Sequence, residues 1–184
     1  MVEHLAYRVA SRSGGIEFRE YPKTVLARVN GMSDGEAFGL LLDYISGSND
    51  SSSRIAMTAP VVSGGETPER LPMTAPVVSA AGWFSFVMPT GREVDTLPGP
   101  KDGRVDIVEV PERTVAALRF RGRANRMQVS AMEAELFGAL RRQNIRITGT
   151  PFLMRYNPPF VPGFLRRNEV GVEVALGEGD GRDG

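Results

Sequence analysis

The sequence predicts an α+β fold in which about eight antiparallel strands carry two helices on one side. Two observations support this prediction. A strand–proline–strand phrase occurs once in each half of the chain, and each copy is followed by a helical pattern and two further β-like segments. We therefore expect two ββαββ halves related by a pseudo-twofold axis. The halves are expected either to leave a ligand cleft where they meet or to pack into a closed core.

The repeated phrase reads EYPKTVLARV in the first half and EVPERTVAALRF in the second. Proline supplies a fixed φ for the turn inside each copy, and β-forming residues lie on both sides of it. The strands expected from the phrase are Ile16–Tyr21, Thr24–Val29, Val105–Val110 and Thr114–Phe120. The segments expected to complete the sheet are Ile55–Ser63, Trp83–Pro89, Pro151–Tyr156 and Glu169–Leu176.

Each half places a helix after its second strand. The first is expected to begin at a capping box, with Ser33 as N-cap and Glu36 at N3, and to end at Gly47. Its apolar residues recur at helical spacing and are Phe38, Leu41, Leu42 and Ile45. Asn125 is expected to cap the second helix, whose apolar stripe is Met132, Leu136 and Leu140.

Composition excludes several classes of function. The chain has 184 residues, with 22 basic and 22 acidic side chains and a formal net charge of zero, which favours one domain and no nucleic-acid-binding surface. It has no Cys, so disulfides, thiolate catalysis and zinc–sulfur sites are excluded. No apolar stretch is long enough to span a bilayer and the N-terminus lacks a signal-peptide core, so we expect a cytoplasmic protein.

The heptad MTAPVVS occurs twice, at Met57–Ser63 and at Met73–Ser79. Methionine is an adaptable apolar side chain of the kind used at binding surfaces, which favours a binding role for Met57. The structural alternative is that both copies consist of ordinary strand and core residues. The turn GGETPERLP joins the copies, and we expect a hairpin or an extended loop in which the second copy has no separate chemistry.

A second apolar segment, YNPPFVPGFLRRNE, lies at 156–169. Phe160 and Phe164 give it an apolar surface suited to covering a pocket, and Arg166 is suited to pairing with a carboxylate at the rim. The structural alternative is a loop with solvated arginines. No catalytic triad, metal motif or phosphate loop is present, and the sole histidine, His4, is expected to be solvated. We therefore expect a binding protein rather than an enzyme.

Three phrases together resemble the SOUL haem-binding protein family. They are IEFREYPKTVLARV at Ile16–Val29, YISGSNDSSSRIAMTAPVV at Tyr44–Val62 and YNPPFVPGFLRRNEVGVEV at Tyr156–Val174. The resemblance implies a distorted antiparallel eight-stranded β-barrel with two helices, built from two pseudo-twofold-related ββαββ halves. It implies a domain at 16–176, with halves at about 16–90 and 105–176. An N-terminal segment at 1–15 and a disordered tail at 177–184 complete the chain.

The resemblance also implies non-covalent binding of haem or a related tetrapyrrole in a hydrophobic cleft, as a carrier or buffer. The residues expected to bind it are Phe38, Leu41, Leu42, Ile45, Arg54, Met57, Phe160, Phe164 and Arg166. Glu20 stands where one member of the family has an axial His, so the iron ligand is left unassigned. Gly35 and Val161 stand where other members have basic residues that pair with the haem propionates.

Two other functions remain open from the sequence. A related gyrase-inhibitor-like fold binds or hydrolyses small molecules, and it would here use a carboxylate and aromatic box of Glu109, Trp83 and Tyr156. A protein-interaction module would instead use the PPFVPGF loop as its contact surface. The sequence leaves the oligomeric state open.

Overall fold

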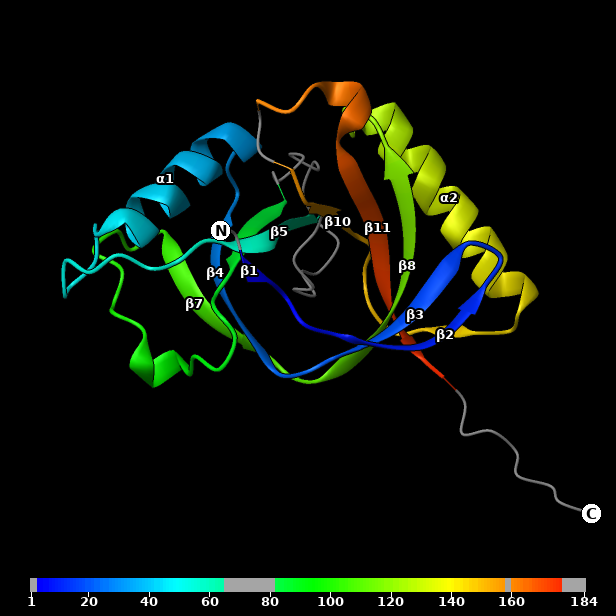
Figure 1. Cartoon of the computed structure of the whole chain (residues 1–184), viewed down its shortest axis with the longest axis horizontal. Helices are drawn as coiled ribbons and strands as arrows, with labels where there is room; N and C mark the ends of the chain where they lie inside the picture. The colour runs from blue at the N-terminus through cyan, green and yellow to red at the C-terminus, as the bar shows by residue number, and fades with distance from the viewer. Residues whose placement is uncertain (1–2, 65–81, 158–159, 177–184) are drawn as a thin grey trace, which may run out of the picture.

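The computed structural model of the protein describes residues 3–64, 82–157 and 160–176. Its strands form one curled sheet flanked by two helices (Figure 1). The elements are β1 (Glu3–His4), β2 (Arg8–Ser13), β3 (Ile16–Tyr21), β4 (Thr24–Asn30), α1 (Asp34–Ser46), β5 (Thr58–Gly64), β6 (Trp83–Val87), η1 (Val94–Thr96), β7 (Val105–Val110), β8 (Arg113–Arg121), α2 (Arg126–Arg142), β9 (Arg146–Ile147), β10 (Phe152–Arg155), η2 (Gly163–Leu165) and β11 (Arg167–Ala175). The predicted α+β class is confirmed.

The strand order shows how two ββαββ units share the sheet. The path is β2-β3-β8-β11-β10-β5-β6-β4-β7, with β1 and β9 attached beside it. The first strand of each unit pairs with the second strand of the other, as β3 with β8 and β4 with β7. Read inward from β3, the path gives a first, a second, a fourth and a third strand of a unit, and read inward from β7 it gives the same order. The two readings meet between β10 and β5, so the sheet is symmetric about that pair. These eight strands correspond to the eight that were predicted.

Strand β2 was not predicted. Its residues are nearly all exposed, so they lack the alternation of apolar and polar side chains that marks a half-buried strand. It pairs with β3 across a turn at Gly14 and Gly15, whose φ angles of 56° and 82° suit a tight hairpin. This hairpin adds an edge strand to the sheet from within the segment 1–15.

The predicted helix caps are present. The side chain of Ser33 accepts a hydrogen bond from the backbone of Glu36, and the Glu36 carboxylate accepts one from Ser33 in return. Gly47 ends α1 with a φ of 120°. At the start of α2, the side chain of Asn125 accepts from the backbone N–H of Gln128. The turn chemistry of the sequence thus fixes where both helices begin.

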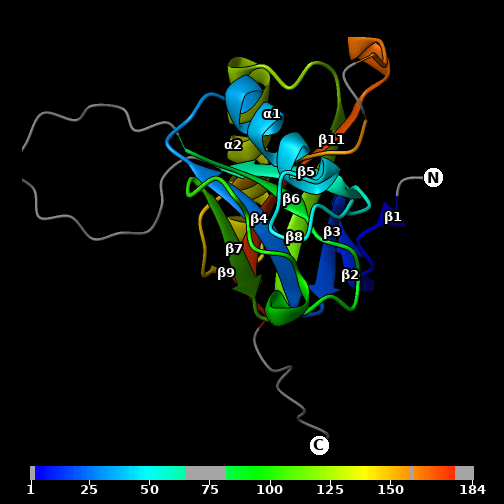
Figure 2. The ribbon, with the colours of Figure 1, turned by 90° about the vertical axis from the view of Figure 1, so that its left-hand side faces the viewer.

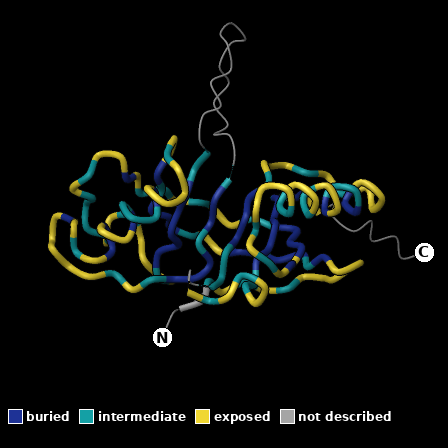
Figure 3. Tube along the Cα trace, turned by 90° about the horizontal axis from the view of Figure 1, so that it is seen from above, coloured by how far each residue is buried: buried dark blue, intermediate teal, exposed yellow. Residues whose placement is uncertain are grey.

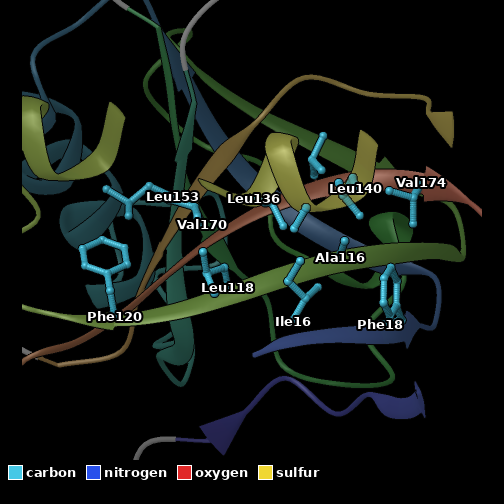
Figure 4. Close-up of a cluster of buried hydrophobic side chains, with 12 residues drawn as sticks. Ile16, Phe18, Ala116, Leu118, Phe120, Leu136, Leu140, Leu153, Val170 and Val174 are labelled. Carbon is cyan, nitrogen blue, oxygen red and sulfur yellow. The ribbon is translucent and has the colours of Figure 1, made fainter. Parts of the chain in front are cut away.

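The hydrophobic core lies on both faces of the sheet, because alternate strand residues point to opposite sides. One face carries a cluster that includes Leu26, Val62, Val115 and Met154. The other, which we call the helix face, carries one cluster beneath each helix. Figure 4 shows Leu136 of α2 packed over strand residues of the α2 cluster. Figure 3 shows that the strands are mostly buried while the outer sides of the helices are exposed.

Two predictions fall on parts of the chain outside the described residues. They are the second MTAPVVS with its joining turn, which after Gly64 lies within 65–81, and the tail at 177–184. The first MTAPVVS lies largely in β5, where the register against β6 shifts between Thr58 and Val61 and so accommodates Pro60. Among the described residues, no helix has the length and apolar character needed to cross a membrane.

Candidate functional site

An apolar cavity of about 230 Å³ lies on the helix face, between α1 and the chain that follows β10. We call it the helix-face cavity. Its apolar wall is formed by Phe38, Met57, Ala59, Val61 and Phe84. Its polar rim is formed by Arg123, Arg155, Tyr156, Asn157, Arg166 and Asn168, and Thr58 completes the lining.

Aromatic packing holds the apolar wall in place. The ring of Phe38 meets the rings of Phe84 and Phe86 edge-on, with centroid separations of 6.5 and 5.3 Å. Such edge-to-face pairs stabilise their geometry beyond the area they bury. Phe38 lies one turn after the capped start of α1, so the cap and the ring pair together fix this side of the cavity.

Thr58, at the edge of the cavity, has an unsatisfied polar atom. Its side chain is fully buried, and its Oγ1 atom has no hydrogen-bond partner among the described residues. A buried polar atom without a partner costs about 1–3 kcal/mol, and such atoms are rare in folded proteins.

The rim is cationic. Arg155 donates hydrogen bonds to Asp34 of α1 at 2.8 Å and to Ser63 of β5 at 2.9 Å. Arg166 donates through Nε to the backbone oxygen of Val161 at 2.8 Å. Arg123 is exposed and forms no ion pair with the described residues. Since no carboxylate among the described residues lines the cavity, its rim is suited to a ligand that carries carboxylates.

A buried ionic cluster supports the wall at Tyr156. The Tyr156 hydroxyl donates to Glu169 at 2.7 Å, and Glu169 also accepts from Arg19 at 3.0 Å and from Arg167 at 2.6 Å. Burial raises the pKa of Tyr156, and the neighbouring Glu169 carboxylate raises it further. Burial alone would raise the pKa of Glu169, but hydrogen bonds from Arg19 and Arg167 outweigh it and lower that pKa. Tyr156 is therefore a neutral donor held by an ionised carboxylate.

Sequence reasoning did not identify Glu169. The alternation along β11 sends Val170, Val172 and Val174 to the helix face, which leaves Glu169 facing the other way into the sheet interior. Its partner Arg19 comes from β3, 150 residues earlier in the chain. The alternation in the sequence predicts which face of β11 carries Glu169. It does not predict that Arg19 lies beside Glu169 and neutralises its charge, because that depends on where the tertiary fold places β3.

Three of the nine predicted binding residues, Phe38, Met57 and Arg166, line the helix-face cavity. Leu41 and Ile45 are buried in the core beneath α1 and do not line the cavity. The reason is helical geometry, since residues four apart share one face and that face packs on the sheet.

The other four predicted residues lie elsewhere. Leu42 is 40% exposed on α1, while Phe160 and Phe164 are 85% and 74% exposed. Arg54 lines a separate hollow of about 290 Å³ beside η1. The structure therefore does not bring these side chains to the helix-face cavity.

The departures from the family pattern also have clear positions. Glu20 of β3 forms an ion pair with Arg8 of β2, away from the cavity lining. The backbone of His4 pairs with Ala59, which belongs to the cavity wall. The described residues contain no group of three or more His, Cys, Asp or Glu that could hold a metal ion.

A larger hollow of about 780 Å³ adjoins the helix-face cavity and shares Arg155 with it. Its lining is mixed, with Trp83 beside the charged side chains of Asp34, Arg126 and Glu133. Burial raises the pKa of Glu133. The smaller cavity has the more apolar wall and is the better site for an apolar ligand.

The alternative box of Glu109, Trp83 and Tyr156 does not form. Glu109 is exposed and lies 3.3 Å from Lys23. Trp83 lines the larger hollow, and Tyr156 lines the helix-face cavity. The three side chains therefore share no site.

Comparison with solved structures places the fold among known ones. An uncharacterized conserved protein from Listeria innocua has a TM-score of 0.64 at 14% identity, covering 90% of this chain and 94% of that one. A structure titled as a hydrolase from Listeria innocua has a TM-score of 0.58 at 14% identity, with the same coverage. The chain also matches EcmrR, solved with DNA, with a TM-score of 0.62 at 11% identity. That match covers 86% of this chain and 56% of EcmrR.

Sequence comparison is more specific. Heme-binding protein 1 of Bos taurus is 29% identical over 135 residues, which is 73% of this chain and 67% of the bovine protein. The family model described as SOUL heme-binding protein matches residues 2–173. The chain therefore belongs to the SOUL haem-binding protein family.

Proposed function

We propose that the protein binds haem or a related tetrapyrrole non-covalently in the helix-face cavity, as a carrier or buffer. The observation that carries this proposal is an apolar wall beside a rim that has three arginines and, in the part of the chain that the structure describes, no carboxylate. A tetrapyrrole combines a flat apolar ring with carboxylate side chains, which suit these two surfaces. Membership of the family and the similarity to bovine heme-binding protein 1 support the same ligand class.

The size and chemistry of the cavity suggest how such a ligand would lie. Its volume of about 230 Å³ is below the roughly 300–1,000 Å³ of typical ligand pockets, so we expect one edge of the ring to enter. Met57 is the sulfur-bearing residue of the wall, and among the side chains that the structure describes no His or Cys lines it. Haem would supply a redox-active iron when bound. The wall offers mainly apolar contact, so we expect recognition of the ring rather than of the metal.

The test is a titration of the protein with hemin and, in parallel, with iron-free protoporphyrin IX. We expect both to give a saturable shift of the Soret band at one equivalent with similar affinity. Met57→Glu should weaken both affinities by about tenfold or more, because it places an unpaired carboxylate in the apolar wall. Leu42→Glu, on the exposed side of α1, is the matched control and should leave affinity unchanged. An unsaturable signal that albumin removes would contradict the proposal.

Two further measurements refine it. His4→Ala tests iron ligation, because the His4 backbone pairs with Ala59 of the cavity wall. A ligand role predicts an altered hemin spectrum and an unaltered porphyrin spectrum.

Transfer of bound hemin to albumin measures release, and a carrier or buffer should release it completely. Retention of hemin in the presence of excess albumin would argue for a permanently bound cofactor instead.

A further inference from the structure

We propose that one end of the molecule docks on membranes that contain anionic lipids. The docking surface is formed by residues 121–127 and 160–167, which we call the tip. The two segments are held together by a backbone hydrogen bond from Gly122 to Arg166 at 3.2 Å and by Asn168, which donates to Gly122 at 2.9 Å. Figure 2 shows η2, within the tip, projecting beyond the body of the molecule.

The tip gathers the most exposed large apolar side chains of the described residues. Met127 and Phe160 are each 85% exposed, Phe164 is 74% exposed and Leu165 is 50% exposed. The other exposed large apolar side chains, Leu42 and Leu176, are only 40% and 39% exposed. Four solvent-exposed apolar side chains at one end of the molecule point to an apolar partner.

The charge of the tip identifies that partner. Its two segments, RGRANRM and FVPGFLRR, contain five arginines and no acidic residue, although the whole chain has a formal net charge of zero. Arg167 is engaged with Glu169, whereas Arg121, Arg123 and Arg126 form no ion pair with the described residues. Aromatic and aliphatic side chains beside basic residues are the combination that inserts at the interface of an anionic bilayer.

A bilayer suits this surface better than a folded protein partner does. A specific protein interface typically buries at least about 1,000 Å² with complementary shape, which favours a broad surface over a narrow projection. A projecting loop with phenylalanine side chains can instead enter between lipid headgroups while its arginines pair with phosphates and carboxylates.

The tip also borders the helix-face cavity, since Arg123 and Arg166 belong to both. A docked protein would therefore present the cavity rim toward the bilayer, where apolar ligands dissolve. Docking does not depend on the identity of the ligand, and it can be tested in the absence of any tetrapyrrole.

The test is co-sedimentation of the full chain with vesicles of phosphatidylcholine, with and without phosphatidylserine. We expect binding only to the vesicles with phosphatidylserine, and weaker binding as salt is raised. Phe160→Ser with Phe164→Ser should weaken binding by about tenfold or more. Arg121→Ser with Arg126→Ser should weaken it by about tenfold.

Matched controls come from the opposite end of β11. They are Leu176→Ser for the apolar change and Arg142→Ser with Arg146→Ser for the charge change, and both should bind like the wild type. All substituted residues are exposed, so circular dichroism should show every variant folded. Equal binding to both vesicle types, or no binding, would overturn the proposal. Self-association of the wild type that the phenylalanine variant abolishes, without lipid binding, would make the tip a protein interface instead.

Discussion

At the scale of single residues, the most unusual side chain is Glu169. It is fully buried, and its carboxylate is enclosed by Arg19, Arg167 and the hydroxyl of Tyr156. Burying a charge is costly unless it is paired and hydrogen-bonded, and here every neighbour that Glu169 binds is a donor. The network joins β3, β11 and Tyr156, which follows β10 and lines the cavity, so it contributes to the shape of the site as well as to stability.

We predict that Glu169→Gln lowers the free energy of unfolding by about 3–5 kcal/mol at neutral pH, because Arg19 keeps its buried charge without its main partner. The folded-state pKa of Glu169 is lowered, so its stabilisation is present above the ordinary Glu pKa. It is lost as pH falls through the folded pKa. Urea unfolding at neutral and acidic pH should therefore show the gap between wild type and variant closing in acid.

Glu112→Gln is the control for this prediction. Glu112 is exposed and forms no ion pair with the described residues, so the change should alter the free energy of unfolding by no more than about 0.5 kcal/mol. A gap between Glu169→Gln and wild type that stays constant with pH would show that ionisation of Glu169 is not the cause.

At the scale of elements, helix α1 divides its predicted apolar residues between three environments. Leu41 and Ile45 pack on the sheet, Phe38 reaches the cavity, and Leu42 faces water. The spacing predicts a helix and an apolar stripe about 100° wide or more. It does not say which edge of that stripe borders a cavity, because the cavity also needs β5 and the chain after β10.

We predict that Leu41→Ala lowers the free energy of unfolding by about 2–5 kcal/mol, because it leaves a void in the core beneath α1. Leu42→Ala should change it by about 1 kcal/mol or less, because Leu42 is 40% exposed and is not part of that core. Denaturant unfolding of the two variants measures the difference. Equal losses for the two variants would contradict the orientation of α1.

At the scale of the whole molecule, the exchange of first strands ties the halves together. β3 of the first unit lies against β8 of the second, and β7 of the second lies against β4 of the first. Neither unit completes its own sheet, and an unpaired edge would be left exposed in a separated half.

We therefore predict that fragments 1–100 and 101–184 do not fold alone, whereas the mixture regains the near-ultraviolet circular dichroism and cooperative unfolding of the intact chain. The measurement is thermal unfolding of each fragment and of the mixture at equal concentration. A fragment that unfolds cooperatively by itself would mean that each half is an independent domain.

The sequence by itself determined the two helices and the eight strands of the two units, in their order. The capping box at Ser33, the strand–proline–strand phrase and the helical stripe are local signals, and local signals suffice because caps and turns involve residues a few positions apart. The repeated phrase also predicted the ββαββ duplication, which the strand order of the sheet matches.

Only the tertiary structure decided which side chains share a site. Phe38, Met57 and Arg166 come together because α1, β5 and the chain after β10 meet on the helix face, whereas Leu41 does not line this cavity because it packs on the sheet. Arg19 and Glu169 illustrate the same limit, since 150 residues separate them in sequence. Sequence spacing predicts which face of an element a residue occupies, but long-range packing alone determines what lies opposite that face.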